Sequence, residues 1–286
     1  MATASVPARI PGNAAPTSVL SNSAASRLWV PAYSLWRREL VRFYRQKARV
    51  VGVIASPLLF WLVLGSGFSK TFQSHGAATA ASSHYLSYFF PGAIVMIVLF
   101  TAIFSMMSLI QDRNEGFLLS VLAAPISRSA IVLGKVLGGA TLAAIQGWIF
   151  LIFSPLAGVH ASPLDILYSF LIIALTSFAL TALGFIIAWP MDSTQAFHAV
   201  INLILIPLWL LSGALFPASG ASGWLRWVML LNPLTYGVDA LRNGLFPTEI
   251  TTFSPEINLI VTLCFCAVLF AGSWAVVNRR TNKPAV

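Results

Sequence analysis

The chain has 286 residues, of which 58% are hydrophobic and only 9% are charged. Soluble domains carry roughly 25% charged residues, so this composition excludes an ordinary water-soluble domain and predicts an all-α membrane protein solvated mainly by lipid. The net charge of +9 does not indicate a nucleic-acid partner, because most basic residues flank apolar stretches, where they orient a membrane protein.

The first 49 residues are polar or amphipathic. Residues 1–30 are rich in Ala, Ser and Pro and lack the apolar stretch of a signal peptide, so we expect a flexible cytoplasmic tail. Residues 31–49 carry two opposed faces at helical spacing. The aromatic face holds Tyr33, Trp36, Leu40, Phe43 and Tyr44, and the basic face holds Arg38, Arg42, Arg45 and Arg49. This pattern predicts an amphipathic helix in the membrane interface; the alternative, a solvated basic helix, leaves the aromatic side chains in water.

Six later stretches have about the 20 apolar residues that a bilayer crossing requires. They are 50–68, 85–110, 131–153, 166–189, 199–216 and 257–277, and none contains Asp, Glu or Arg. Basic residues cluster before the first stretch, after the second and after the last. The positive-inside rule therefore predicts six spans, with residues 111–130, residues 281–286 and both chain ends in the cytoplasm.

The segment 217–256, between the fifth and sixth predicted spans, is of a different kind. Its apolar run 224–231 is too short to cross a bilayer and contains Arg226. We expect a re-entrant or interfacial helical hairpin on the outer face, broken at Asn232-Pro233 because the residue before a proline avoids the helical conformation.

The sequence pattern in residues 111–130 predicts a short helix with an apolar face. Phe117, Leu118, Val121 and Leu122 recur at spacings of three and four, charged residues precede them, and Pro125 ends the helix. Two interpretations stay open: the apolar face fills the groove of a partner protein, or it packs on the ends of the spans.

Few other residues are candidates for a site. Gln146 and Asn202 are polar groups inside predicted spans, where they form interhelical hydrogen bonds or line a path. Asp239 and Arg242 are three residues apart on a predicted helix, where they form a local stabilising pair or take part in gating. Cys264 and Cys266 point to different faces of a helix, and the histidines are scattered, so we expect no metal or redox site.

Two motifs make the chain similar to a known family. The first comprises Arg113, Glu115-Gly116, a leucine-containing helix, Pro125, Ser127-Arg128 and Gly134-Lys135. It resembles the coupling loop of type 2 ATP-binding-cassette exporter permeases. The second comprises Asn232, Pro233 and Tyr236, with Arg242 six residues later, and is similar to the family's C-terminal signature. The resemblance covers residues 31–280, and the daunorubicin-resistance and nodulation-type permeases look most similar.

The resemblance implies a non-catalytic membrane subunit in the bacterial cytoplasmic (inner) membrane. It implies two partners, a second copy or similar permease and a separate nucleotide-binding subunit that holds ATP and magnesium; this chain itself has no phosphate-binding loop and needs no cofactor. In the coupling loop, Arg113 and Glu115 would orient the helix and Gly116 would allow close approach. The apolar anchors in the partner's groove would be Leu118, Val121 and Leu122, flanked by Pro125 and Arg128.

The resulting prediction is an ATP-driven exporter subunit for an amphipathic drug, lipid or glycan. The alternative is an ion-coupled secondary transporter or channel, which needs ionisable groups near the bilayer midplane, and the predicted spans contain none at that depth. An intramembrane enzyme needs a nucleophile, a base or metal ligands that face one cavity, and the predicted spans contain no such set of residues.

Overall fold

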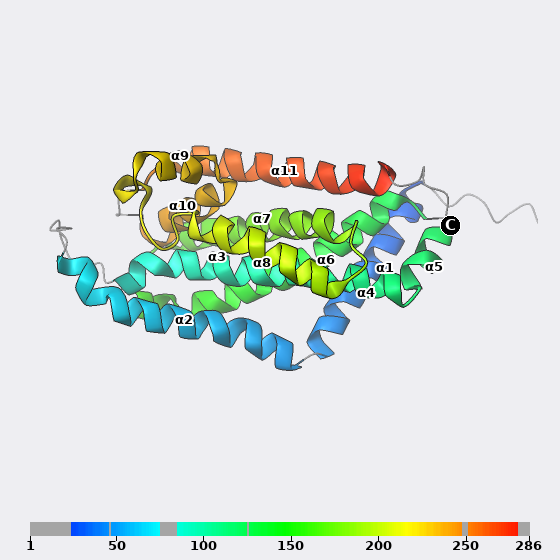
Figure 1. Cartoon of the computed structure of the whole chain (residues 1–286), viewed down its shortest axis with the longest axis horizontal. Coiled ribbons are helices and arrows are strands. Elements are labelled where there is room, and N and C mark those ends of the chain that lie inside the picture. The colour runs from blue at the N-terminus through cyan, green and yellow to red at the C-terminus, as the bar shows by residue number, and fades with distance from the viewer. Residues whose placement is uncertain (1–23, 46, 75–84, 125, 248–250, 280–286) are drawn as a thin grey trace, which may run out of the picture.

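The structure, a computed structural model, describes residues 24–45, 47–74, 85–124, 126–247 and 251–279 (Figure 1). In these ranges the chain forms helices and no strand, which confirms the predicted all-α class. The elements are α1 (Ala24–Arg45), α2 (Lys47–Ser74), α3 (Tyr85–Ser105), α4 (Met107–Asn114), α5 (Phe117–Ala123), α6 (Arg128–Phe150), η1 (Leu151–Ala157), α7 (Pro163–Ala188), α8 (Thr194–Leu210), η2 (Ala218–Gly220), α9 (Gly223–Leu231), α10 (Pro233–Leu245) and α11 (Pro255–Arg279).

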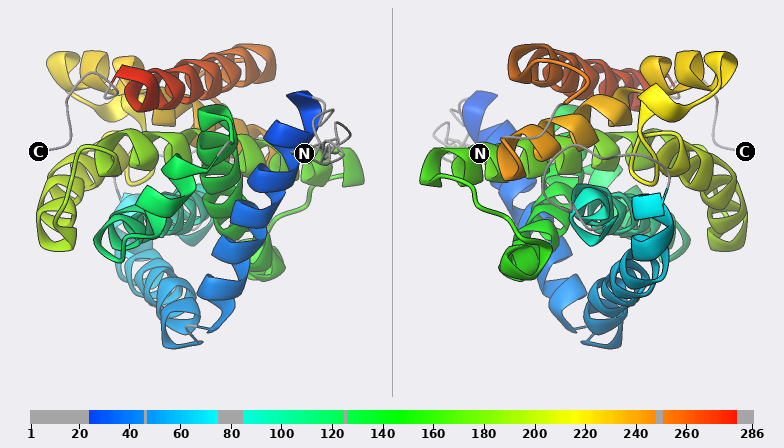
Figure 2. Two further views of the ribbon diagram at one scale, coloured as in Figure 1. Left: turned by 90° about the vertical axis from the view of Figure 1, so that its right-hand side faces the viewer. Right: turned by 90° about the vertical axis from the view of Figure 1, so that its left-hand side faces the viewer.

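The long helices α2, α3, α6, α7, α8 and α11 run along the longest axis of the molecule (Figure 1). Helices α9 and α10 lie at one end of this bundle, which we call the α9 end. Helices α4 and α5 lie at the other, the α5 end, and α1 crosses the bundle there, as the end-on views show (Figure 2). Helices α4 and α5, in the predicted coupling loop, and helices α9 and α10, in the predicted hairpin, are therefore at opposite ends of the bundle.

Four helical stretches of the described chain are long and apolar enough to cross a bilayer: Tyr85–Asn114, Arg128–Ala157, Pro163–Ala188 and Pro255–Arg279. The first and fifth predicted spans correspond to the shorter apolar stretches Pro57–Gly67 and Thr194–Leu210. Helix α8 ends at Leu210 because the chain turns there, and Gly213 takes a left-handed φ of 78°. The multi-pass character is thus established, whereas the count of six spans stays a prediction.

Helix α1 begins at Ala24, so residues 24–30, predicted as tail, are helical; residues 1–23 and 280–286 lie outside the described residues. The buried face of α1 comprises Ala32, Leu35, Glu39 and Phe43 and packs against α6, whereas Tyr33 and Tyr44 are exposed. The buried side thus shares Phe43 with the predicted aromatic face, and the Trp36 indole of that face donates to the Thr141 hydroxyl of α6 at 3.1 Å. The placement of α1 in the membrane interface stays a prediction.

Two glycines of α6 permit the close approach of α1. A Cβ atom at Gly134 would lie 2.7 Å from the carbonyl oxygen of Ala32, and one at Gly138 would lie 2.8 Å from the Cβ of Glu39. Small residues four apart on a helix form a flat strip on which a second helix can lie. The Gly134 position of the coupling-loop motif therefore has a packing role.

The predicted break at Asn232-Pro233 is confirmed, since α9 ends at Leu231 and α10 begins at Pro233. Helix α10 is mostly buried and packs against α7 and α11. Helix α9 instead exposes large apolar side chains, with Trp224 and Trp227 about 70% accessible. Two short helices with a break between them therefore precede α11, and their arrangement as a re-entrant or interfacial hairpin stays a prediction.

Candidate functional site

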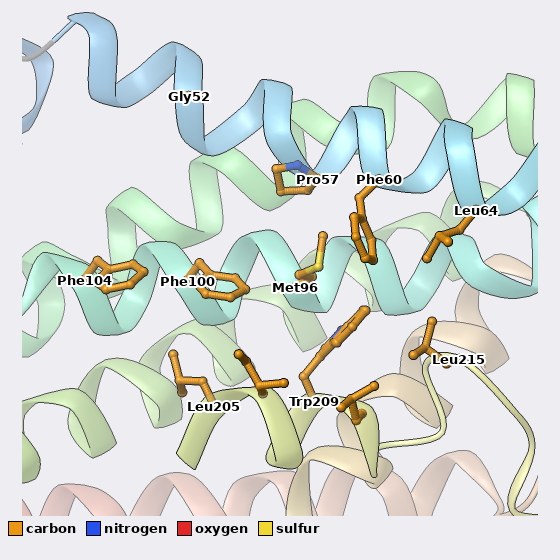
Figure 3. A pocket seen from close by; sticks show the side chains of 12 residues that line it. Gly52, Pro57, Phe60, Leu64, Met96, Phe100, Phe104, Leu205, Trp209 and Leu215 are labelled. Atoms are coloured by element: carbon orange, nitrogen blue, oxygen red, sulfur yellow. The ribbon is translucent and has the colours of Figure 1, made fainter. Parts of the chain in front are cut away.

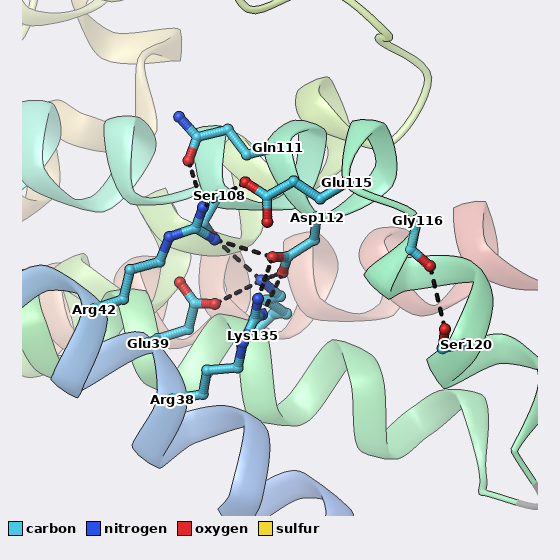
Figure 4. A network of polar contacts seen from close by, with 10 residues as sticks. All are labelled: Arg38, Glu39, Arg42, Ser108, Gln111, Asp112, Glu115, Gly116, Ser120 and Lys135. Atoms are coloured by element: carbon cyan, nitrogen blue, oxygen red, sulfur yellow. Dashed lines mark hydrogen bonds and ion pairs between the residues drawn. The ribbon is translucent and has the colours of Figure 1, made fainter.

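A buried cluster of charges lies at the α5 end, centred on Asp112 of α4 (Figure 4). The Asp112 carboxylate has no solvent-accessible surface. Arg38 of α1 donates two hydrogen bonds to it, at 2.8 and 2.7 Å, and Arg42 donates one at 2.9 Å. Lys135 of α6 donates to Oδ2 of the same carboxylate. Asp112 therefore joins three helices through a single side chain.

Lys135 is the second centre of the cluster. Its side chain is 1% exposed, and its Nζ donates to Glu39 at 2.5 Å and to Ser108 at 3.3 Å. All three of its donor sites thus have an oxygen partner when the bond to Asp112 is included. Such complete pairing is what makes a buried ammonium tolerable.

The rim of the cluster faces solvent. Arg42 reaches Gln111 at 2.9 Å and Glu115 at 3.5 Å, but the Glu115 side chain is 60% exposed, so this outer pair contributes little. The hydrogen bonds to Asp112 raise the pKa of Arg38 above its usual value, with its burial opposing them. The cluster as a whole pairs three cations with three carboxylates, so its net charge is zero.

The sequence reading missed the partners in this cluster. The sequence pattern places Arg38 and Arg42 on the basic face of an interfacial helix and Lys135 in the coupling-loop motif, and it predicts no role for Asp112 or Glu39. The contacts join residues that are 23 to 96 positions apart, and no periodicity reports such distances. One signal was available: a lysine next to an apolar stretch requires an acidic partner once it is buried.

Gly116 forms the turn between α4 and α5. Its φ is 75°, in the left-handed region that favours glycine, and a Cβ atom there would have nothing within 4 Å. Within this chain, Gly116 is thus required by the turn and not by a close contact. The predicted close approach to a partner stays a prediction.

Helix α5 has one face packed on this chain and one face exposed. Leu118 is 4% exposed, and Phe117 and Val121 are partly buried against the core; Arg38 lies 3.7 Å over the Phe117 ring. On the other face, Leu119 is 67% exposed and Leu122 is 41% exposed. The interpretation that the apolar face packs on this chain is therefore confirmed for Leu118, whereas the interpretation that it fills a partner's groove stays a prediction. Leu118 and Val121 are directed to the chain's own core and not, as predicted, toward a partner.

The end of α5 and the start of α6 follow the expected chemistry. Ala124 is extended, as a residue before proline should be; Pro125 itself lies outside the described residues. Ser127 is the N-cap of α6 and accepts a hydrogen bond from the Ala130 amide at 3.2 Å. Arg128 is the first residue of α6.

Arg113 is directed away from α5, toward the turn between α7 and α8. Its guanidinium donates to the carbonyl oxygens of Trp189 at 2.5 Å and Met191 at 2.7 Å, and pairs with Asp192 at 2.9 Å. The adjacent Asn114 donates to the Asp192 carbonyl at 3.3 Å. The last residues of α4 thus bind the segment that leads into α8.

The C-terminal signature caps the opposite end of α8. Asn232 donates to the Leu208 carbonyl at 2.7 Å and accepts from the Leu234 amide at 3.0 Å, so that it also caps α10. Arg242 donates to the Gly213 carbonyl at 3.2 Å and lies over the Tyr88 ring. Carbonyl groups at a helix C-terminus lack intrahelical partners, and the signature side chains supply them.

The other signature residues hold the hairpin together. Pro233 occupies the first turn of α10, where its missing N–H costs nothing. The Tyr236 hydroxyl donates to the Leu230 carbonyl at 3.0 Å, and its ring stacks on Phe253. Asp239 lies 3.8 Å from Arg242, which confirms the predicted local pair, and also accepts from the Thr252 and Phe253 amides.

Comparison with known proteins decides the family. Residues 32–246, well over half of the chain, match the family model described as "ABC-2 type transporter". The chain belongs to the ABC-2 type transporter family. It is 28% identical to the putative transport permease ycf38 of Cyanophora paradoxa, over 83% of this chain and 86% of the relative. It is 24% identical to Nodulation protein J of Rhizobium meliloti (strain 1021), over 86% and 92% of the two chains. The resemblance to permeases is thus confirmed.

In this ABC-2 type transporter chain, an apolar groove of about 500 Å³ lies between α2, α3 and α8 (Figure 3). Phe60 of α2, Phe100 and Phe104 of α3, and Trp209 of α8 supply aromatic walls, and none of the described residues that line the groove is charged. The Trp209 indole donates to the Gly92 carbonyl at 2.9 Å, which fixes its orientation. The groove suits an apolar or amphipathic molecule better than an ion.

The two predicted path-lining residues have different environments. Gln146 is 3% exposed and accepts from the Thr101 hydroxyl at 2.5 Å, as the packing interpretation requires, and it does not line the groove. Asn202 is exposed on α8, one turn before Ile206, which does line the groove. Of the two, Asn202 alone keeps the possibility of contacting a transported molecule or a partner subunit.

The described residues contain no group of three His, Cys, Asp or Glu side chains placed to hold a metal ion. Cys264 is exposed and Cys266 is buried, and both thiols are free. Their different environments agree with the prediction that they face different sides of α11.

Proposed function

We propose that this chain is the membrane-spanning subunit of an ATP-driven exporter, which forms the translocation path and docks a separate nucleotide-binding subunit. The observation that carries the proposal is the exposed face of α5. Leu119 and Leu122 lie on the exposed face of a short helix, and the other face of this helix packs against the bundle. Exposed apolar side chains on a helix that is packed firmly against its own chain form a surface that fits an apolar groove in a partner.

The charge cluster supports this proposal because it fixes the base of α5. Asp112 lies four residues before Gly116 and binds α1 and α6 through Arg38 and Lys135. A force applied to α5 is therefore passed to α1 and α6 and is not lost in a flexible loop. ATP and magnesium would be bound by the partner, and this chain would have no catalytic role.

The groove supports an apolar or amphipathic cargo, such as a drug, a lipid or a lipid-linked glycan. Because the groove is open on one side, a single chain does not enclose a path. A second copy of this chain or a similar permease, meeting it across α2 and α8, would close the groove. We place the assembly in the bacterial cytoplasmic membrane, with the α5 end and both chain ends in the cytoplasm.

The competing function, an ion-coupled transporter, would draw on the buried ionisable groups Glu39, Asp112 and Lys135. These groups lie at the α5 end and are fully paired with one another and with Arg38, whereas an ion path needs groups that open to a cavity. The groove residues that the structure describes include no ionisable group.

Copurification tests the proposal. The tagged chain is isolated in mild detergent and its partners are identified, using wild type, Leu122→Ala and the control Leu231→Ala, which removes an 80% exposed leucine at the α9 end. A nucleotide-binding subunit should accompany wild type and the control. Its affinity should fall for Leu122→Ala by about 1–2 kcal/mol, as for a partly buried anchor. Recovery of wild type without any ATPase would refute the proposal.

A further inference from the structure

Helix α8 is held firmly at its two ends and only weakly in between. Its buried face consists of Phe197, Ile201, Leu205 and Trp209, and its other positions are partly or fully exposed. At the α9 end, its Leu208 carbonyl is bound by the signature residue Asn232. At the α5 end, the turn before it is bound by Arg113 and Asn114.

The contact at the α5 end joins α8 to the same helix that carries α5. Arg113 occupies the last turn of α4, three residues before Gly116 and the start of α5. Its guanidinium spans the turn by contacting two carbonyl oxygens, those of Trp189 and Met191. This turn begins at the C-terminus of α7 and leads into α8, which begins at Thr194.

The carbonyl contacts are the strong part of this connection. Asp192 is 80% exposed, so its ion pair with Arg113 is screened by water and contributes little. The Trp189 carbonyl lies instead at the C-terminus of α7, where the helix dipole favours a cation. A charge-assisted hydrogen bond is roughly twice as strong as a neutral one. The planar fork of arginine can bind two acceptors at fixed angles, which the lysine ammonium does not reproduce.

We propose that Arg113 is a positioning residue that links α5 to α8, so that displacement of α5 by the nucleotide-binding subunit moves the α8 wall of the groove relative to α2. The link rests on the proposed function, since it needs a partner that moves α5. Helix α8 is the wall that can respond, because α3, which forms the floor of the groove, is buried along most of its length between other helices. Arg113 therefore controls the groove without contacting the transported molecule.

The distance between α2 and α8 tests this link. Cysteines replace Val63 of α2 and Leu203 of α8, both about 65–75% exposed, in a chain lacking Cys264 and Cys266, and both carry spin labels. The labelled chain is mixed with excess unlabelled chain and reconstituted with its nucleotide-binding subunit in vesicles. The interlabel distance is measured without nucleotide and with ATP under non-hydrolysing conditions.

The variants separate the carbonyl contacts from the ion pair. Arg113→Gln and Arg113→Lys remove the two-carbonyl contact, and Lys keeps the charge. Asp192→Asn removes only the ion pair, and Arg45→Gln removes an exposed arginine of α1. We expect the ATP-dependent change in distance to be lost in Arg113→Gln and Arg113→Lys, and to be kept in Asp192→Asn and Arg45→Gln. The nucleotide-binding subunit should stay bound in all four variants.

Four outcomes overturn the link. If Arg113→Gln keeps the full distance change, Arg113 does not carry the motion. If both Arg113 variants lose the nucleotide-binding subunit, Arg113 acts in docking. If wild type binds its ATPase and hydrolyses ATP while the labels do not move, the link fails and the proposed function stands. If wild type binds no ATPase, the proposed function fails and the link with it.

Discussion

Lys135 of α6 and Glu39 of α1 form an ion pair with an Nζ–Oε1 distance of 2.5 Å, although their side chains are 1% and 4% exposed. This pair is the main polar contact between α1 and α6 besides the shared carboxylate of Asp112. It lies next to Gly134 and Gly138 of α6, which we call the glycine strip. The same face of α6 therefore provides both the ion pair and the space that α1 needs for close packing.

Removing the lysine tests how much this pair stabilises the bundle. Lys135→Met leaves the Glu39 carboxylate buried without its cation, which should lower the free energy of unfolding by about 3–5 kcal/mol. The measurement is denaturation of the purified chain in detergent. The control Arg226→Ala removes an exposed charge of α9 and should change the stability by less than about 0.5 kcal/mol. Equal effects of the two changes would mean that the cluster is not buried.

The glycine strip gives a second prediction. In Gly134→Val the added Cβ meets the carbonyl oxygen of Ala32, a backbone atom that cannot rotate away. We expect α1 to be displaced and the free energy of unfolding to fall by about 1–3 kcal/mol. Gly67→Ala is the matched control, since a Cβ there meets nothing within 4 Å and alanine favours a helix. A tolerated Gly134→Val would contradict the packing of α1 on α6.

The two faces of α5 should separate by experiment. Leu118→Ala removes a side chain packed in the core and should lower the free energy of unfolding by about 2–5 kcal/mol. Leu119→Ala removes an exposed side chain and should leave stability unchanged while weakening the binding of the nucleotide-binding subunit. Thermal unfolding and subunit affinity, measured on both variants, give the comparison. The reverse pattern would mean that α5 is turned over in the assembly.

The signature residues should differ in effect according to the bonds that they make. Asn232→Ala leaves the Leu208 carbonyl and the Leu234 amide without partners and should cost about 1–3 kcal/mol. Tyr236→Phe removes one hydroxyl bond and keeps the stack on Phe253, so it should cost about 0.5–1.5 kcal/mol. Hydrogen exchange of residues 208–215 should rise in Asn232→Ala but not in Tyr236→Phe. Equal exchange in both would remove the capping role of Asn232.

Sidedness is tested by single cysteines at the two ends of the bundle. In a chain lacking Cys264 and Cys266, Ser120→Cys lies on the exposed face of α5 and Ser222→Cys lies just before α9. An impermeant thiol reagent added to intact cells should label position 222 and spare position 120 until the cells are opened. Labelling of position 120 in intact cells would mean that the α5 end faces outward and that the proposed orientation is wrong.

The sequence predicted those features that depend on local pattern. Apolar length placed the long helices, and the proline rule placed the break after Asn232, because both signals act within a few residues. The face of α5 that is buried could not be predicted, because the direction of α5 is set by the turn at Gly116. The roles of Arg113 and Arg242 could not be predicted either. Each binds carbonyl groups of a distant segment, and a carbonyl group carries no sequence signal.

The packing of α1 on α6 has a consequence for the order of assembly during synthesis. Residues 24–45 leave the ribosome before residues 128–150, yet Glu39, Arg38 and Arg42 obtain their buried partners only from α4 and α6. Until then these charges must stay hydrated, because an unpaired ion is too costly to bury. Helix α1 therefore stays at the water-facing surface and docks late, once α4 and α6 are in place. Docking of α1 then marks completion of the α5 end of the bundle.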